Sequence, residues 1–295
     1  MYLRPAAAAA AALLGATALV APAAPSAARA RESLCQHCPV VFAHRGASAY
    51  APENTLAAID LADRMGFEWV ENDVQRTKDG RLVVMHDDNL VRTTNAEEVF
   101  PGRAPWKVKD FTAAEIARLD AGSWFDQKFA GARVPTLEQY VNRLSHNEQR
   151  LLLEIKKPEL YPGIEQDTLR VLDEAGWLDA VHVNERLVIQ SFGVESLRSV
   201  HQQRPEVTTG FLGTPPVADL AAYAAFTDRI NPSHTTITSG YVAAIHALNG
   251  AHGRPLEVNT WTVDDAAGAV RARDLGVDGI ITNNPDVVGE AVCEG

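Results

Sequence analysis

The chain has 295 residues, a formal net charge of −11 and 46% hydrophobic residues, a composition that suits a globular protein with a sizeable core. Such an acidic balance argues against a general nucleic-acid-binding surface, which needs clustered lysine and arginine to neutralise phosphates. Excess carboxylates suit a cation site, although most of them are expected to be ordinary solvated surface charges.

The first thirty residues have the pattern of a secretory signal. Arg4 forms a positive n-region, an apolar run covers residues 6–20, and Ala28-Arg29-Ala30 has the form of a cleavage site. The alternative is a membrane anchor, but the run is shorter than the ~20 residues that cross a bilayer. We expect cleavage after Ala30. Residues 31–295 would then be secreted or retained in the cell envelope, without stable membrane insertion.

Three cysteines, Cys35, Cys38 and Cys293, would enter an oxidising compartment in an exported protein. The spacing of Cys35 and Cys38 is that of a metal or redox motif, but zinc binding is weakly supported because no second pair follows. A disulfide between Cys35 and Cys38, or from either of them to Cys293, is favoured. One thiol would be left over, and the sequence does not say which.

Strand-like and helix-like segments alternate along the rest of the chain. Residues 88–132 interrupt this rhythm with polar, glycine- and proline-containing sequence and one short helical piece near 113–119, so we interpret them as an insertion. The expected strands are 39–43, 67–74, 81–85, 150–155, 187–191, 207–211, 229–231, 256–260 and 279–282, and the expected helices are 54–65, 136–144, 164–175, 195–203, 217–226, 240–249, 264–275 and one that starts near Pro285.

Single helices between successive strands favour parallel βαβ units. Roughly eight such units in about 250 residues predict an α/β fold of the (β/α)8 TIM-barrel type, with the active site at the carboxyl ends of the strands. The insertion would form a small subdomain. A doubly wound open sheet is the structural alternative.

Acidic residues fall at the predicted strand ends. Glu71 and Asp73 lie two positions apart on one strand, so their side chains point to the same side. A divalent cation with oxygen ligands would offset their repulsion, and Glu154 could add a third carboxylate. Any one of these acids is more simply a solvated strand end, but the set of three predicts a metal site. Oxygen donors without a cysteine or histidine cluster favour Ca²⁺ or Mg²⁺ over zinc.

Two histidines and two cations accompany these acids. His44 and His86 could exchange protons near neutral pH, and cleavage of a phosphodiester needs one group to activate the nucleophile and another to protonate the leaving alcohol. Arg45 and Lys156 could contact phosphate oxygens. The plainer interpretation is that both histidines are structural and that both cations only balance the carboxylates.

In this order, the residues resemble the glycerophosphodiester phosphodiesterase family over residues 39–290. The matching strings are His44-Arg45-Gly46, Pro52-Glu53-Asn54-Thr55, Glu71-x-Asp73, His86-Asp87, Glu154-x-Lys156, Gln190-Ser191-Phe192, Trp261-Thr262-Val263 and the stretch from Asp278 to Asp286.

The resemblance implies a TIM barrel with an inserted subdomain after the third strand. It also implies acid–base roles for the two histidines and phosphate contacts from the two cations. It further implies metal ligation by Glu71, Asp73 and Glu154, a place near the metal for Glu53, and aromatic cleft walls at Phe192 and Trp261, for which core packing is an equal alternative. Asn72 replaces the apolar residue that is usual between the first two ligands, and its side chain should point away from the metal.

The expected activity is hydrolysis of a small-molecule glycerophosphodiester to glycerol 3-phosphate and an alcohol, with Ca²⁺ favoured over Mg²⁺. The protein would act as a monomer or homodimer and would not bind nucleic acid. One alternative is a lipid-directed barrel phosphodiesterase, which is disfavoured because the sequence indicates no amphipathic or aromatic-rich loop that would mark membrane engagement. A second is a non-catalytic exported protein that binds phosphate esters and needs no histidine pair. The sequence decides neither the head group nor the nucleophile.

Overall fold

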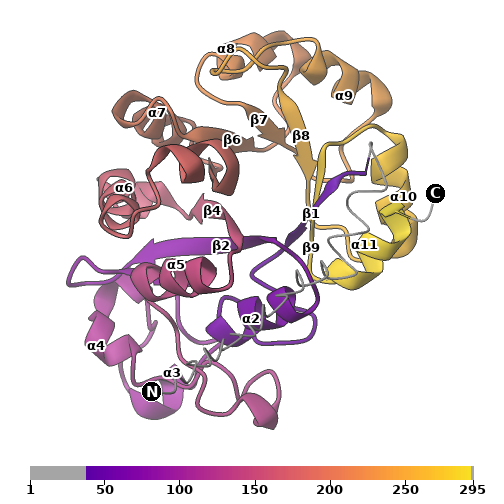
Figure 1. The fold of residues 1–295 in the computed structure, drawn as a ribbon. Coiled ribbons are helices and arrows are strands. Elements are labelled where there is room, and N and C mark those ends of the chain that lie inside the picture. Colours follow the sequence, from indigo (N-terminus) through magenta and orange to yellow (C-terminus); the bar gives the residue numbers. More distant parts are fainter. Residues whose placement is uncertain (1–37, 294–295) are drawn as a thin grey trace, which may run out of the picture.

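The computed structural model describes residues 38–293, and this part of the chain contains a closed barrel of eight parallel strands with helices outside it (Figure 1). β1 pairs in parallel with both β2 and β9, which closes the ring and excludes the open-sheet alternative. The barrel strands are β1 (Val40–Ala43), β2 (Trp69–Arg76), β4 (Arg150–Ile155), β5 (Leu187–Ser191), β6 (Thr208–Leu212), β7 (Arg229–Asn231), β8 (Glu257–Thr260) and β9 (Gly279–Thr282).

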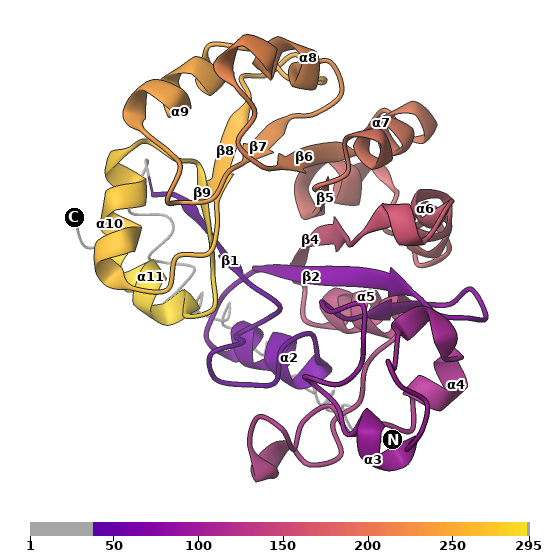
Figure 2. The same cartoon turned by 180° about the vertical axis from the view of Figure 1, so that it is seen from behind.

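Helices surround the barrel, as the opposite view also shows (Figure 2). Threonine or aspartate side chains cap several of their first turns: Thr55 and Thr136 accept hydrogen bonds from backbone N–H groups of the helices they precede. The outer helices are α2 (Leu56–Arg64), α5 (Leu137–His146), α6 (Ile164–Glu174), α7 (Val194–Gln203), α8 (Leu220–Ala224), α9 (Ser239–His246), α10 (Ala266–Asp274) and α11 (Pro285–Cys293).

Successive side chains along a strand point alternately into the barrel and toward the outer helices, so the protein has two hydrophobic cores. Leu151 and Leu153 of β4 belong to the cluster beneath the helices, whereas Leu152 packs inside the barrel with Phe42 and Trp69. Strands that are buried on both faces read as nearly continuous apolar runs, and this pattern is clear in β4. The same parity directs Glu71, Asp73 and Glu154 inward, because they lie two residues from Trp69, four from Trp69 and two from Leu152.

The predicted strand at 81–85 lies outside the barrel. β3 (Leu82–Val84) pairs antiparallel with the carboxyl end of β2, with Val74 opposite Val84 and Arg76 opposite Leu82. β2 therefore continues past Asp73, and Glu71 and Asp73 lie within the strand. The prediction that they end it was wrong, because pairing with β3 extends β2 to Arg76.

Residues 88–132 contain only short helical pieces: α3 (Ala96–Val99), η1 (Val108–Asp110), α4 (Ala113–Ile116) and η2 (Gln127–Phe129). Their apolar side chains form a hydrophobic cluster with Val83, Met85 and Val134, in which Phe111, Ile116 and Leu119 are fully buried. One loop of this segment carries Trp124, Phe125 and Phe129 in edge-to-face contacts, with Trp124 40% exposed. The expectation that the chain lacks an aromatic-rich loop was therefore wrong.

Other elements differ modestly from the expected ranges. Residues 217–219 form a 3₁₀ turn (η5) before α8, and a short π-helical segment (η4, His182–Arg186) precedes β5. Within residues 38–293, no helix has the length and apolar character to span a bilayer. The expected signal and Cys35 lie outside the described residues. Cys38 lies beside α11, with its Sγ 3.5 Å from the carbonyl oxygen of Val292.

Candidate active site

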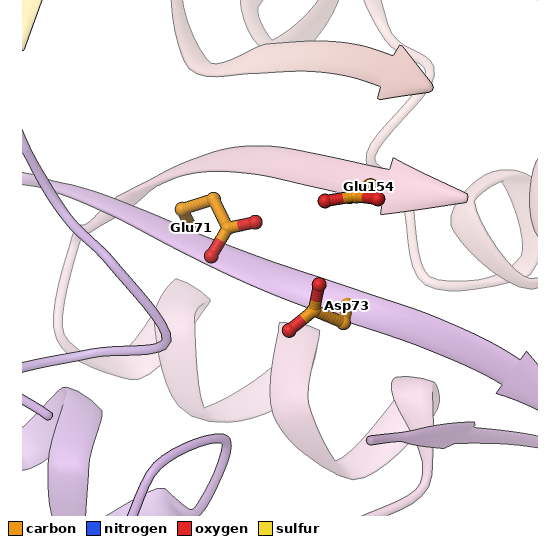
Figure 3. A group of neighbouring side chains, drawn as sticks. All are labelled: Glu71, Asp73 and Glu154. Carbon is orange, nitrogen blue, oxygen red and sulfur yellow. The ribbon is translucent and has the colours of Figure 1, made fainter. Parts of the chain in front are cut away.

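Three carboxylates converge inside the barrel (Figure 3). Glu71 and Asp73 come from β2 and Glu154 comes from β4, whose register places Glu154 beside Asp73. Each contributes an oxygen, and these oxygens lie within 4.8 Å of one another. All three side chains are buried. The structure thus brings together the acids that the sequence analysis proposed as metal ligands.

This acidic cluster is short of positive charge. Burial, followed by the charge of Asp73, raises the pKa of Glu71 well above its usual range and that of Glu154 to about 8. Burial opposes ionisation of Asp73 as well, but the charges of Arg45 and Lys156 outweigh it and lower the pKa of Asp73. Three buried acids that share two cations fit a divalent cation, and their oxygen donors fit Ca²⁺ or Mg²⁺.

The two predicted phosphate-binding cations contact the acids directly. Arg45 Nε lies 3.1 Å from Asp73 Oδ2, and its backbone N–H donates to Glu71 Oε2 at 3.0 Å. Lys156 Nζ lies 2.8 Å from Glu154 Oε1 and 3.6 Å from Asp73 Oδ1. Both cations therefore balance carboxylates in this structure.

A tight turn after β1 positions His44 and Arg45. Arg45 adopts a left-handed backbone with φ of 57°, and Gly46 follows with φ of 81°. A Cβ atom on Gly46 would lie 2.6 Å from the Cβ of Ala58 in α2. The turn thus requires glycine for both its conformation and its close approach to the helix.

His44 is oriented by the far end of the chain. Its Nδ1 lies 2.7 Å from Asn283 Oδ1. The amide nitrogen of Asn283 donates to Asp264 at 2.8 Å, which turns the amide oxygen toward the imidazole. Nδ1 therefore carries the proton, and Nε2 faces the acids with its lone pair, 3.9 Å from Glu71 Oε2. Burial and the charge of Arg45 lower the pKa of His44 to about 4.

His86 follows β3 and lines the same mouth of the barrel. Its Nδ1 lies 2.7 Å from Asp87 Oδ1, so its Nε2 is free to face the cleft. The cleft has a volume of about 440 Å³, and its lining includes His86, Glu154, Lys156 and Phe192. Burial lowers the pKa of His86 despite the nearby carboxylates. The two predicted acid–base residues thus flank the acidic cluster.

Phe192 and Trp261 follow β5 and β8 and contact each other edge to face, with ring centroids 5.6 Å apart. Phe192 is 51% exposed at the cleft. Trp261 is half-buried, packs on the cluster inside the barrel and donates its indole N–H to the carbonyl oxygen of Asn231. Phe192 therefore has the position of a cleft wall, whereas Trp261 combines that position with core packing.

Several polar neighbours of the site had no assigned role in the sequence analysis. Asn54 donates to Asp73 Oδ2 at 2.8 Å, and Gln190 donates to Glu71 Oε1 at 3.4 Å. Both residues lie in strings that match the family, Pro52-Glu53-Asn54-Thr55 and Gln190-Ser191-Phe192. Their polar side chains in these strings could have indicated a place in the site. Arg92 and Asp264 gave no such signal, because Arg92 contacts Glu53, 39 positions away, and Asp264 contacts Asn283, 19 positions away.

Asn72 lies on the opposite face of β2 from the acids, as expected. It is fully buried, and neither side-chain polar atom has a hydrogen-bond partner among the described residues.

A larger hollow, about 830 Å³, lies at the opposite end of the barrel and is lined by residues that include Phe42, Trp69 and Arg229. None of the predicted site residues borders it. The predicted site residues therefore lie at the carboxyl ends of the strands, where enzymes of this fold keep their active sites.

A closed parallel barrel with acids and histidines gathered at this end has the architecture of a TIM-barrel enzyme. Residues 44–287 match the model of the glycerophosphoryl diester phosphodiesterase family. The chain belongs to this family, and it is an enzyme of the phosphoric diester hydrolase class.

Relatives and solved structures agree with this assignment. A glycerophosphodiester phosphodiesterase of Bacillus subtilis is 36% identical over 261 residues, which cover 84% of each chain. One from Caldanaerobacter subterraneus is 36% identical over 264 residues, covering 87% of this chain and 98% of the relative. The structure of an Oleispira antarctica phosphodiesterase in complex with the product sn-glycerol-3-phosphate has a TM-score of 0.72 and 28% identity, covering 89% of this chain and 98% of that one.

Proposed function

We propose that this enzyme hydrolyses glycerophosphodiesters to glycerol 3-phosphate and an alcohol, with a divalent cation held by Glu71, Asp73 and Glu154. The observation that carries the proposal is the convergence of these three buried carboxylates between two histidines at one barrel mouth. The related Oleispira enzyme, which binds sn-glycerol-3-phosphate as its product, supports the substrate class.

The bound cation would polarise the phosphate and offset the negative charge that develops in the transition state. Arg45 and Lys156, which already border the acids, would orient the phosphate oxygens. Their positive charges would also keep the diester close to the two imidazoles.

The histidines would move the protons. One imidazole takes a proton from the attacking hydroxyl as the new P–O bond forms. The other donates a proton to the departing alkoxide oxygen as the old P–O bond breaks. His44 and His86 each have Nδ1 engaged by a neighbour and Nε2 left for this transfer. The attacking hydroxyl would come from water or from the glycerol itself. In the second case a cyclic phosphate would form as the alcohol departs, and water would then open it to glycerol 3-phosphate.

A coupled assay for released glycerol 3-phosphate tests the proposal. Glycerophosphocholine and glycerophosphoethanolamine should be cleaved in the presence of Ca²⁺ or Mg²⁺, with Ca²⁺ the more effective, and EDTA should abolish turnover. Full activity in excess chelator would exclude the metal.

A comparison of soluble diesters with intact micellar phospholipid tests the lipid-directed alternative. The exposed Trp124 in its aromatic loop makes this comparison necessary. Faster cleavage of the micellar lipid would favour that alternative.

We also propose export, on the signal-like sequence of residues 1–30 alone. Amino-terminal sequencing of protein recovered from outside the cytoplasm should begin at Arg31. A chain that keeps its first thirty residues would contradict cleavage.

A further inference from the structure

Arg92 joins two parts of the active site through a single guanidinium group. It belongs to the segment inserted after β3, outside the barrel. Its Nε and Nη2 donate to Asp87 at 2.7 and 3.1 Å. Its Nη1 and Nη2 donate to Glu53 at 2.7 and 2.8 Å. The planar guanidinium group of Arg92 thus binds two carboxylates that come from separate loops.

Through Asp87, Arg92 is connected to His86, one of the two proposed acid–base residues. Asp87 accepts the Nδ1 hydrogen bond of His86 at 2.7 Å, and the same Asp87 oxygen also accepts from Arg92. An imidazole can rotate about its side-chain bonds, so the direction of its Nε2 depends on what holds Nδ1. Arg92 fixes both oxygens of Asp87 and thereby fixes the plane in which His86 is held.

Through Glu53, Arg92 is connected to Arg45, the cation that contacts Asp73. Glu53 accepts from Arg45 Nη1 at 2.9 Å, and Arg45 Nε lies 3.1 Å from Asp73 Oδ2. Without Arg92, Glu53 and Asp87 would be two neighbouring carboxylates that repel each other. Both are well covered, with side chains 12% and 24% exposed, so water would screen that repulsion incompletely.

We propose that Arg92 is a positioning residue, which acts through Asp87 and Glu53 to hold His86 and Arg45 in their working orientations. The inference rests on the proposed function of His86. It gives the inserted segment a part in catalysis, since this segment supplies the guanidinium that links the two loops. Lysine at this position has one charged point and lacks the planar fork, so it cannot serve both carboxylates in the same geometry.

The first test measures steady-state kinetics of Arg92→Ala and Arg92→Lys with glycerophosphocholine and saturating Ca²⁺. We expect kcat to fall about 10- to 100-fold for Arg92→Ala, with a partial loss for Arg92→Lys and KM nearly unchanged, as for residues that orient a working side chain. A rise in KM with normal kcat would overturn the proposal, because Arg92 would then bind substrate.

Arg103→Ala is the matched control. Arg103 lies in the same inserted segment, has a similar side-chain exposure (37% against 44%) and also pairs with a carboxylate, that of Glu115. It stacks on Phe111 and donates to Glu115 and to the carbonyl oxygen of Asp110, neither of which belongs to the site. We expect Arg103→Ala to lower thermal stability at least as much as Arg92→Ala while kcat stays normal. An equal loss of kcat in both variants would overturn the proposal, because it would show that Arg92 only stabilises the inserted segment.

A double-mutant cycle shows whether Arg92 acts through Asp87. Asp87→Asn should itself lower kcat, and adding Arg92→Ala should lower it by much less than in the wild-type background. Losses that simply multiply would overturn the proposal. His86→Ala separates the two claims: normal turnover in that variant removes the proposed role of His86. Loss of turnover there, with normal turnover in Arg92→Ala, removes only the role of Arg92.

Discussion

The imidazole of His44 and the side-chain amide of Asn283 are joined by a 2.7 Å hydrogen bond between residues 239 positions apart in the chain. The bond exists because β1 and β9 are neighbours in the closed barrel, so the residues that follow them meet at one rim. Asp264 holds the amide from behind and decides which of its ends the imidazole contacts.

Replacing Asn283 should therefore impair His44 without removing it. We expect Asn283→Ala to lower kcat by about 10-fold or more, since the imidazole loses the partner that sets its proton position. Nitrogen-15 spectra of labelled histidine should show His44 leaving the tautomer protonated on Nδ1. Unchanged spectra and unchanged kcat would show that Asn283 does not orient His44.

His44→Ala and His86→Ala should each remove most of the turnover, because acid–base catalysis contributes about 10²- to 10⁴-fold. Both variants should keep the fold by circular dichroism and should keep their affinity for Ca²⁺ by calorimetry. A variant with near-normal kcat would take its histidine out of the mechanism.

The metal-free protein should lose stability as pH rises from about 6.5 to about 8. Below pH 6.5 the lowered pKa of His44 acts in the opposite direction, because its imidazole stays neutral in the folded state while it is protonated in the unfolded state. Burial and the charge of Asp73 raise the pKa of Glu154 from 4.5 to about 8, so the folded state binds more protons than the unfolded state from about pH 6.5 to about pH 8. The contribution of this one proton to the free energy of unfolding is then present at low pH and falls by at most about 1.4 kcal/mol per pH unit.

Urea titrations in EDTA at several pH values measure this dependence. Excess Ca²⁺ should raise the free energy of unfolding, most strongly at the alkaline end, because the ion replaces protons on the acids. Glu154→Gln should flatten the pH dependence in EDTA. A wild-type protein whose metal-free stability rises over the same interval would contradict the assignment.

The interior of the barrel should be sensitive to loss of volume. Leu152 is fully buried among Phe42, Trp69, Val188 and Ile281, and Leu152→Ala should reduce the free energy of unfolding by about 2–5 kcal/mol. Val217→Ala is the control, because Val217 is 56% exposed and should change stability by less than about 0.5 kcal/mol. Equal effects in urea denaturation would contradict the packing described for Leu152.

Phe192 should affect substrate binding more than chemistry. Its ring is 51% exposed at the cleft and 5.7 Å from Lys156 Nζ, so Phe192→Ala should fold normally and raise KM with little change in kcat. Steady-state kinetics with two head groups measures the effect. A large loss of kcat with KM unchanged would place Phe192 in the chemical step instead.

Much of the site could be predicted from strand periodicity and residue type. The two-residue spacing of Glu71 and Asp73 predicts that they share a face, and the structure places both inside the barrel. The spacing does not reveal where β2 ends, because the pairing of its last residues with β3 depends on a neighbouring strand.

The sequence by itself determined which residues could hold a cation, move protons and bind phosphate, because these capacities belong to side-chain chemistry and local spacing. Only the tertiary structure decided which groups hold them in place. Asn283 reaches His44, and Arg92 reaches Glu53 across 39 positions, because barrel closure and the docking of the inserted segment bring these loops together. Such contacts depend on the packing of the whole chain, and no local pattern records them.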